Sequence, residues 1–212
     1  MIQQETRCVV LCAGRLKGKP PEVSKNDFVI AVDGGYKHAK KAKIKPNLVI
    51  GDFDSLKKPP DLPASKIVRL PREKDETDLL AALNYGLEKG FKNFHIYGAS
   101  GGRIDHTLAA VQNLAYLASK GARGYLYTKK TVVTAINKDL KLRGVRGIVS
   151  VFAHGGDALG VTLDGLKYKL KDAALSSGYP IGISNQPESE PVYIGLKSGT
   201  LIVAYPRGTK EE

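Results

Sequence analysis

The chain of 212 residues contains no tryptophan, only two cysteines and one methionine, and just 7% aromatic residues. So few cysteines exclude a scaffold held together by disulfides. No stretch approaches the roughly 18 uninterrupted apolar residues of a membrane-spanning helix. The sequence also does not open with a basic segment followed by an apolar core, as a signal peptide does. We therefore expect a globular, cytoplasmic protein with no membrane association.

The two cysteines, Cys8 and Cys12, lie in one apolar run. If that run is a strand, their Cα atoms are about 13 Å apart, which is beyond the reach of a disulfide. The four histidines show no spacing typical of zinc ligands. We therefore expect both thiols to be buried and reduced.

Acidic residues are outnumbered, because 33 lysines and arginines stand against 21 aspartates and glutamates, a net charge of +12. Such a surface attracts anions, but it does not decide among nucleic acid, acidic lipid and a phosphorylated small molecule. Part of the excess falls in one run that we expect to be a solvated helix face. This run contains Lys37, Lys40, Lys41, Lys43 and Lys45.

The first part of the chain alternates strand-like and helix-like segments. This alternation predicts an α/β domain of residues 1–135 with a mostly parallel sheet, a Rossmann-like three-layer arrangement. The expected strands are Arg7–Ala13, Phe28–Asp33, Asn47–Asp52, Ile67–Leu70, Asn93–Tyr97 and Gly124–Thr128. One helix is expected to begin at Asp75 and to end at Gly90. A second is expected to run from near Asp105 to Gly121.

The second part of the chain has short β-rich segments separated by turn residues and no long helical period. This pattern predicts an all-β sandwich of residues 136–212. The expected strands after the first domain's sheet are Thr131–Ile136, Ile148–Ala153, Leu159–Leu163, Leu166–Leu170, Gly182–Ser184, Val192–Leu196 and Leu201–Tyr205.

Acidic and glycine-rich clusters follow four of the expected parallel strands. These clusters begin at Asp33, Gly51, Asp75 and Gly98. Ligands of an open parallel sheet bind at the carboxyl ends of its strands, so we expect the clusters to line one crevice. Asp52 and Asp54 are two residues apart, so an extended backbone places both side chains on one edge.

Carboxylates that converge on one crevice repel one another unless a cation neutralises them. Oxygen ligands of this kind suit Mg²⁺, and Lys74 and Arg103 add positive charge for a polyphosphate. The P-loop and dinucleotide-binding glycine patterns are absent, so another device must hold a nucleotide. Each cluster alone has a plainer interpretation. An Asp-x-Asp pair is common in surface turns, and Asp75 and Asp105 could simply be helix caps.

In order and spacing, the clusters resemble the motifs of the thiamin pyrophosphokinase family, over about residues 8–205. The matching segments are Asp33-Gly34-Gly35, Gly51-Asp52-Phe53-Asp54-Ser55, Lys74-Asp75-Glu76-Thr77-Asp78, Gly101-Gly102-Arg103-Ile104-Asp105-His106, Gly165-Leu166-Lys167-Tyr168-Lys169-Leu170 and Gly182-Ile183-Ser184-Asn185. The resemblance implies transfer of pyrophosphate from ATP to the hydroxyl of thiamine, which gives thiamine diphosphate and AMP. It also implies a homodimer with the site between the α/β domain of one subunit and the sandwich of the other.

The resemblance assigns roles to individual residues. It places Asp52, Asp54 and Asp78 on Mg²⁺ and makes Asp54, Asp78 and Asp105 the catalytic acids. The residues that it places on the nucleotide are Asp33, Gly34, Gly35, Lys74, Thr77 and Arg103. It places Tyr168, Ser184 and Asn185 on thiamine. The general base stays open: Asp78 and Asp105 are candidates, and the alternative is that the metal alone acidifies the hydroxyl.

Two positions depart from the usual family pattern. Gln186 stands where the family often has glutamate, and Tyr168 stands where many members have tryptophan. Neither change removes an expected metal ligand. Tyr168 could also be an ordinary strand tyrosine.

Two other functions compete with this interpretation. A nucleotide-sugar transferase could use Asp52 and Asp54 to hold a metal diphosphate, but it has no use for the segment from Asp75 to Asp78. A basic RNA-binding module would explain the net charge. The low aromatic content and the lack of an aromatic-basic motif argue against nucleic acid as the partner.

Overall fold

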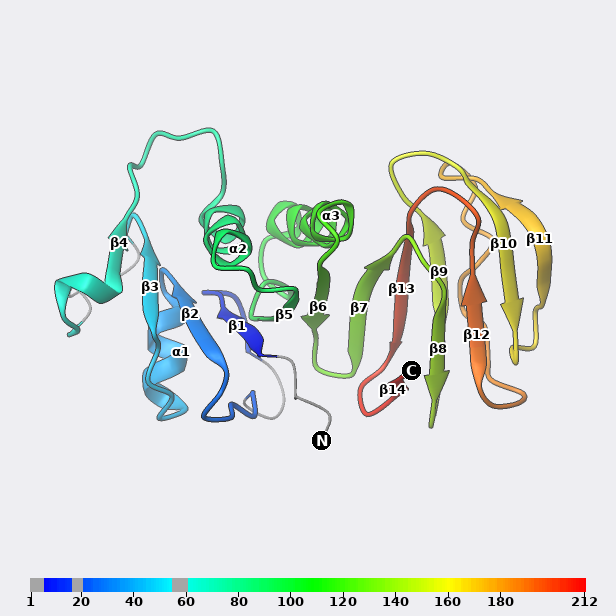
Figure 1. The fold of residues 1–212 in the computed structure, drawn as a ribbon, viewed down its shortest axis with the longest axis horizontal. Coiled ribbons are helices and arrows are strands. Elements are labelled where there is room, and N and C mark those ends of the chain that lie inside the picture. Colours follow the sequence, from blue (N-terminus) through cyan, green and yellow to red (C-terminus); the bar gives the residue numbers. More distant parts are fainter. Residues whose placement is uncertain (1–5, 17–20, 55–60) are drawn as a thin grey trace.

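The computed structural model describes residues 6–16, 21–54 and 61–212. Two β-sheets organise this part of the chain (Figure 1). The larger sheet has nine strands in the order β4-β3-β2-β1-β5-β6-β7-β13-β9 and extends across the long axis of the molecule. The smaller has five strands in the order β11-β10-β12-β8-β14 and packs beside one end of the larger sheet.

The first half of the large sheet is parallel. Its strands are β1 (Arg7–Leu11), β2 (Phe28–Val32), β3 (Leu48–Gly51), β4 (Ile67–Arg69), β5 (Asn93–Tyr97) and β6 (Arg123–Tyr127). β1 is buried on both faces: Cys8 and Val10 belong to one core cluster, whereas Val9 and Leu11 belong to another. The strand order runs outward in opposite directions from β1 and β5. The crevice beyond their carboxyl ends is therefore a topological switch point, where such sheets bind ligands.

Within the described ranges, three α-helices cover the parallel strands. They are α1 (Gly35–Lys41), α2 (Asp78–Glu88) and α3 (Ile104–Ser119), and a short 3-10 helix, η1 (Ala64–Lys66), precedes β4. α2 and α3 pack on one face of the sheet, and Ala39 of α1 packs on the other. The lysine run around α1 is exposed, as expected. None of the helices in the described ranges combines the length and apolarity needed to cross a membrane.

The start of α2 differs from the expectation. The helix begins at Asp78, and its N-cap is Thr77, whose side-chain oxygen accepts a hydrogen bond from the Leu80 amide at 3.2 Å. The interpretation of Asp75 as the cap was therefore wrong. An acidic run offers several possible cap residues, and the hydroxyl nearest the first turn is used.

The second half of the large sheet is antiparallel and forms a sandwich with the small sheet. The strands are β7 (Thr131–Ile136), β8 (Leu140–Arg143), β9 (Ser150–Ala153), β10 (Ala158–Asp164), β11 (Leu170–Leu175), β12 (Val192–Gly195), β13 (Leu201–Pro206) and β14 (Lys210–Glu211). β7 pairs with β6 on one side and β13 on the other, so one sheet joins the mostly parallel part to the antiparallel sandwich. The expected boundary at residue 135 falls at the end of β7.

Two expected strands of the sandwich were wrong. The segments 166–170 and 182–184 are irregular, apart from an isolated bridge between Leu166 and Pro187, and β11 begins only at Leu170. Gly165 has φ +71°, and a side chain there would collide with the Ser189 and Pro191 carbonyls. A tight turn therefore replaces regular pairing at this point. β8 and β14 were not among the expected strands.

The two cysteines give a direct test of the buried first strand. Both are free and buried, as expected, and burial raises the pKa of each thiol to about 12. At neutral pH we expect neither Cys8 nor Cys12 of the native protein to react with Ellman's reagent. Both should react at once in guanidinium chloride. Rapid labelling of the native protein would contradict the packing of β1 between two layers.

Candidate active site

A cavity of about 910 Å³ lies at the carboxyl ends of the parallel strands. All four expected clusters contribute to it. The candidate residues that line it are Asp33, Asp52, Asp54, Lys74, Thr77, Asp78, Arg103 and Asp105. The sequence-based expectation that these acids share one crevice is therefore correct for the described residues. Ser55 lies outside the described residues.

Three carboxylates form the centre of the cavity. Asp33, Asp52 and Asp78 each offer one oxygen, and these oxygens lie within 4.8 Å of one another. Asp33 adopts a left-handed backbone, φ +46°, and its Oδ1 accepts a hydrogen bond from the Phe53 amide at 3.2 Å. A Cβ on Gly51 would lie 1.9 Å from that same oxygen, so only glycine leaves room for the Asp33 carboxylate.

Asp54 lines the cavity but is not part of this group of three. The expectation that an extended backbone places Asp52 and Asp54 on one edge fails because Phe53 has φ +62°. The chain turns at Phe53, and the exposed Asp54 donates its amide to Asp52 Oδ1 at 3.0 Å. Asp33, which had been expected to contact the nucleotide, completes the group instead.

The grouping of carboxylates perturbs the charge state of the site. Burial, then the hydrogen-bonded carboxyl of Asp78 and the charge of Asp52, raise the pKa of Asp33 to about 7, against the opposing Phe53 amide. The Lys74 ammonium lies 2.7 Å from Asp78 Oδ1. Burial tends to lower the pKa of Lys74, but this pairing leaves it raised. A divalent cation fits here, because oxygen-only donors of like charge are held close together.

The rim of the cavity carries exposed charges. The Arg103 guanidinium bonds both carboxylate oxygens of Asp105, at 3.2 and 2.5 Å. Both side chains are exposed, so this pairing is available for exchange with a ligand. Gly34 and Gly35 do not line the cavity. They begin α1, where a Cβ on Gly35 would lie 1.8 Å from the Leu11 carbonyl.

The floor of the cavity depends on a close approach of two loops at the switch point. Gly14 donates its amide to the Gly98 carbonyl at 2.8 Å. Gly98 has φ +71°, and a Cβ there would lie 2.5 Å from the Cys12 carbonyl. A larger residue at either glycine would therefore push the ends of β1 and β5 apart.

The sequence analysis gave no role to several polar residues that line the cavity, among them Arg72, Glu76 and Asn113. Asn113 lies on α3 and is 8% exposed, and its Nδ2 has no hydrogen-bond partner in the described part of the chain. In the sequence, Asn113 is a polar residue within the apolar stripe of the second expected helix, and this could have indicated a functional role. Arg72 and Glu76 lie two residues before and two residues after Lys74 in the sequence. Their closeness to this expected phosphate ligand was the available signal.

The expected thiamine residues lie elsewhere in the chain. Tyr168, Ser184 and Asn185 belong to the sandwich, and none of them lines the carboxylate cavity. Tyr168 is 62% exposed, so its ring is not part of the core. Asn185 is 2% exposed, and its amide accepts from the Tyr168 N–H at 2.9 Å and donates to the Tyr168 carbonyl at 2.7 Å. Asn185 therefore fixes the backbone that presents Tyr168.

Comparison with known proteins gives one consistent result. Family models described as "Thiamin pyrophosphokinase, catalytic domain" and "Thiamin pyrophosphokinase, vitamin B1 binding domain" match residues 21–126 and 135–201. The chain is 27% identical to thiamin pyrophosphokinase 1 of Caenorhabditis elegans, over 94% of this chain and 89% of the relative. It is 28% identical to thiamine pyrophosphokinase of Bacillus subtilis (strain 168), over 85% and 89%.

A solved structure gives the same result for the fold. The crystal structure of thiamine pyrophosphokinase from Bacillus subtilis superposes with a TM-score of 0.83 at 25% identity, covering 95% of this chain and 99% of that chain. The described elements are thus those of a two-domain fold with a mostly parallel sheet and an antiparallel sandwich.

The carboxylate group predicts how metal binding responds to substitution. We expect Asp52→Asn to weaken Mn²⁺ binding by about tenfold or more, because it removes one charged donor from the group of three. Asp54→Asn is the matched control, since it removes an acid from the same loop but outside that group. Mn²⁺ electron paramagnetic resonance, without nucleotide, measures both affinities. An equal or larger effect of Asp54→Asn would contradict the geometric assignment.

Proposed function

The chain belongs to the thiamin pyrophosphokinase family, and we propose that its carboxylate cavity binds ATP together with Mg²⁺ for pyrophosphoryl transfer to thiamine. The observation that carries the proposal is the meeting of Asp33, Asp52 and Asp78 at the switch point of a parallel sheet. Open sheets bind nucleotides at such points.

The reaction forms a bond between the hydroxyl oxygen of thiamine and the β-phosphorus of ATP. The bond from that phosphorus to the oxygen shared with the α-phosphate breaks, and AMP leaves. Lys74 and Arg103 are positioned to bind phosphate oxygens. Each now pairs with an aspartate that a bound nucleotide can replace. Such transfers depend on positioning and charge neutralisation more than on covalent catalysis.

The chain's own acids have separate tasks in this proposal. Asp33, Asp52 and Asp78 would hold Mg²⁺, which when bound neutralises and orients the phosphates. We keep Asp54 as a further ligand of the nucleotide-bound metal, because it lines the same cavity. The proton of the thiamine hydroxyl passes to Asp78 or Asp105. Thr77, which lines the cavity, remains a proposed nucleotide contact, whereas Gly34 and Gly35 begin α1 outside the cavity and are no longer proposed.

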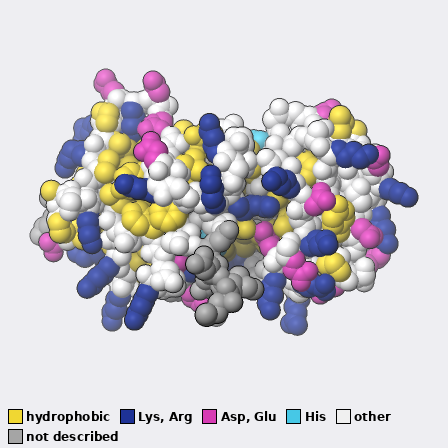
Figure 2. Space-filling model, in the orientation of Figure 1, with side chains coloured by type: hydrophobic (Ala, Val, Ile, Leu, Met, Phe, Trp, Pro, Cys, Tyr) yellow, Lys and Arg dark blue, Asp and Glu magenta, His cyan; other side chains and the backbone are white. Residues whose placement is uncertain are grey.

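Several broader features are also proposals. The reversal of strand order supports a Rossmann-like description of the parallel part. We retain 1–135 and 136–212 as the domain division, which the family-model ranges support. A cytoplasmic location stays a prediction. On the face of the molecule in Figure 2, lysines and arginines are scattered and mixed with acids, so no basic stripe favours RNA as the partner.

We propose a homodimer in which the sandwich of one subunit supplies Tyr168 and Ser184 to the cavity of the other. Within one described chain these residues do not line the cavity. The sandwich also exposes large apolar side chains, which a second copy would cover. They are Ile148, Phe152, Tyr179, Ile181 and Ile183.

The products of the reaction test the proposed activity. With ATP, Mg²⁺ and thiamine we expect equal amounts of AMP and thiamine diphosphate. Asp78→Asn should lower turnover by about a hundredfold or more, because it removes a charged ligand of the metal ion that neutralises the phosphates. The matched control is Asp75→Asn, an exposed acid of the same loop outside the cavity, which should keep wild-type turnover. ADP as the product, or nucleoside diphosphate released from a nucleotide sugar, would contradict the proposal.

Mixing two defective variants tests the shared site. Asp78→Asn damages the cavity, and Tyr168→Ala removes an exposed ring from the sandwich. Each alone should be poorly active at low thiamine concentration. After co-refolding, random dimers should recover about a quarter of wild-type activity, since half of them contain one intact site. No recovery, although exchange of subunits is verified by mass spectrometry, would place both halves of the site in one chain.

A further inference from the structure

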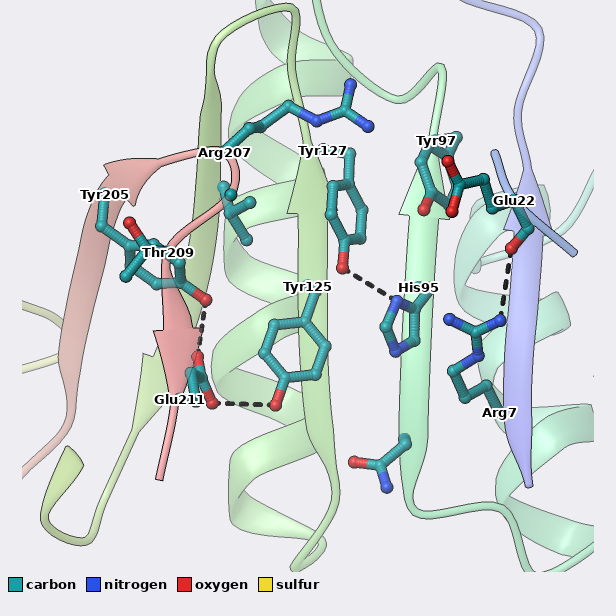
Figure 3. Close-up of a pocket in the computed structure, with 13 residues that line it drawn as sticks. Arg7, Glu22, His95, Tyr97, Tyr125, Tyr127, Tyr205, Arg207, Thr209 and Glu211 are labelled. Atoms are coloured by element: carbon teal, nitrogen blue, oxygen red, sulfur yellow. Dashed lines mark hydrogen bonds between the residues drawn. The ribbon is translucent and has the colours of Figure 1, made fainter. Parts of the chain in front are cut away.

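A second cavity, of about 520 Å³, lies on the face of the large sheet opposite α2 and α3. α1 packs over β1 and β2 on this face, and the small sheet packs over β7, β13 and β9. β5 and β6 lie between these two covers. Their outward side chains therefore form the floor of a gap (Figure 3). The cavity shares no lining residue with the carboxylate cavity.

The floor of this cavity is aromatic. His95 and Tyr97 of β5 and Tyr125 and Tyr127 of β6 point to it, because alternate strand residues share a face. The Tyr97 and Tyr127 rings stack at 4.5 Å, and the His95 ring stacks on Tyr127 at 5.5 Å. Figure 3 shows these rings side by side across the two strands. Such a surface suits a planar ring, and the volume lies in the roughly 300–1,000 Å³ range of small-molecule sites.

His95 presents an open ring nitrogen to the cavity. The Tyr127 hydroxyl lies 2.9 Å from His95 Nδ1. Burial, and then the charge of Arg7, lower the pKa of His95 to about 4, so the ring is neutral and has one donor nitrogen and one acceptor nitrogen. Within the described chain Nε2 has no hydrogen-bond partner, and it can serve a ligand in either role.

Two further donors come from the turn between β13 and β14. The Thr209 hydroxyl is buried and has no hydrogen-bond partner in the described residues. The Arg207 guanidinium lies 5.3 Å from the Tyr127 ring centroid and donates one bond to the Thr128 carbonyl at 3.3 Å. No carboxylate of the described ranges lies within ion-pair distance of it. Arg207 and Thr209 thus line the cavity beside the aromatic floor, with donors that no described residue accepts.

The acceptors of this cavity are largely engaged. Glu211 accepts bonds from the Tyr125 and Tyr205 hydroxyls, at 2.9 and 2.5 Å. Arg7 is paired with Asp27, and Glu22 is exposed at the rim. The open groups are therefore mainly donors, from Thr209 and Arg207. A ligand that satisfies them must be rich in acceptors, and a guanidinium favours a phosphate.

We propose that this cavity is a binding site for a nucleoside monophosphate. The base packs on the rings of β5 and β6, and the phosphate accepts bonds from Arg207 and Thr209. The site does not rest on the proposed function, because it uses none of the residues of the carboxylate cavity. Occupancy would tie the β13–β14 turn to β5.

Calorimetric titration of the full chain with AMP in EDTA tests the proposal. Without a divalent metal, the carboxylates of the other cavity repel a phosphate. We expect one saturable site in both the wild type and Asp52→Asn. Adenosine, which lacks the anion, and inorganic phosphate, which lacks the ring, should each bind at least about tenfold more weakly. Adenosine binding as tightly as AMP, loss of binding in Asp52→Asn, or no AMP binding at all would overturn the proposal.

Two substitutions locate the binding. Arg207→Gln should weaken AMP binding by about ten- to a hundredfold, since it removes a charge-assisted donor. Thr209→Val should weaken it by about two- to tenfold, yet leave Tm of the free protein unchanged or higher, because an unsatisfied buried hydroxyl is removed. Circular dichroism checks the fold of both. Unchanged AMP affinity in Thr209→Val would overturn the proposal even if Arg207→Gln fails to fold.

Discussion

The mutual repulsion of carboxylates gathered at one end of a parallel sheet is the constraint around which this molecule is arranged. Asp33, Asp52 and Asp78 come from three separate segments, and the fold holds their oxygens within 4.8 Å of one another. The Phe53 amide holds Asp33, and the missing side chain of Gly51 leaves room for it. A folded chain keeps such a group only where a cation or a proton can offset the charge.

The large sheet connects the part of the chain that carries these carboxylates to the sandwich. β7 pairs with parallel β6 and antiparallel β13, so the two parts of the chain share backbone hydrogen bonds. The sandwich therefore has a fixed orientation relative to the carboxylates. On its surface, the buried Asn185 amide holds the backbone of the exposed Tyr168. A rigid support for an exposed ring is what recognition of a flat heterocycle requires.

The sequence predicted the clusters at the strand ends well, because most of them directly followed a strongly apolar run. β5 and β7 have the expected bounds, and the carboxylate cavity contains all four clusters. The sequence alone could not predict that Asp33, and not Asp54, belongs to the group of three carboxylates. That exchange depends on the left-handed backbone of Phe53, which nothing in residue type or spacing reveals. The prediction of a strand at 166–170 was wrong for a similar reason. Alternating apolar and polar residues suggested a strand there, but Gly165 forms a tight turn.

The most direct test of the central claim is the anomalous scattering of Mn²⁺ in crystals grown with ATP. The account predicts one strong peak about 2–2.5 Å from carboxylate oxygens of Asp52 and Asp78, with Asp33 in contact or one water away. A peak held by other residues, or an empty cavity with these side chains turned apart, would contradict it.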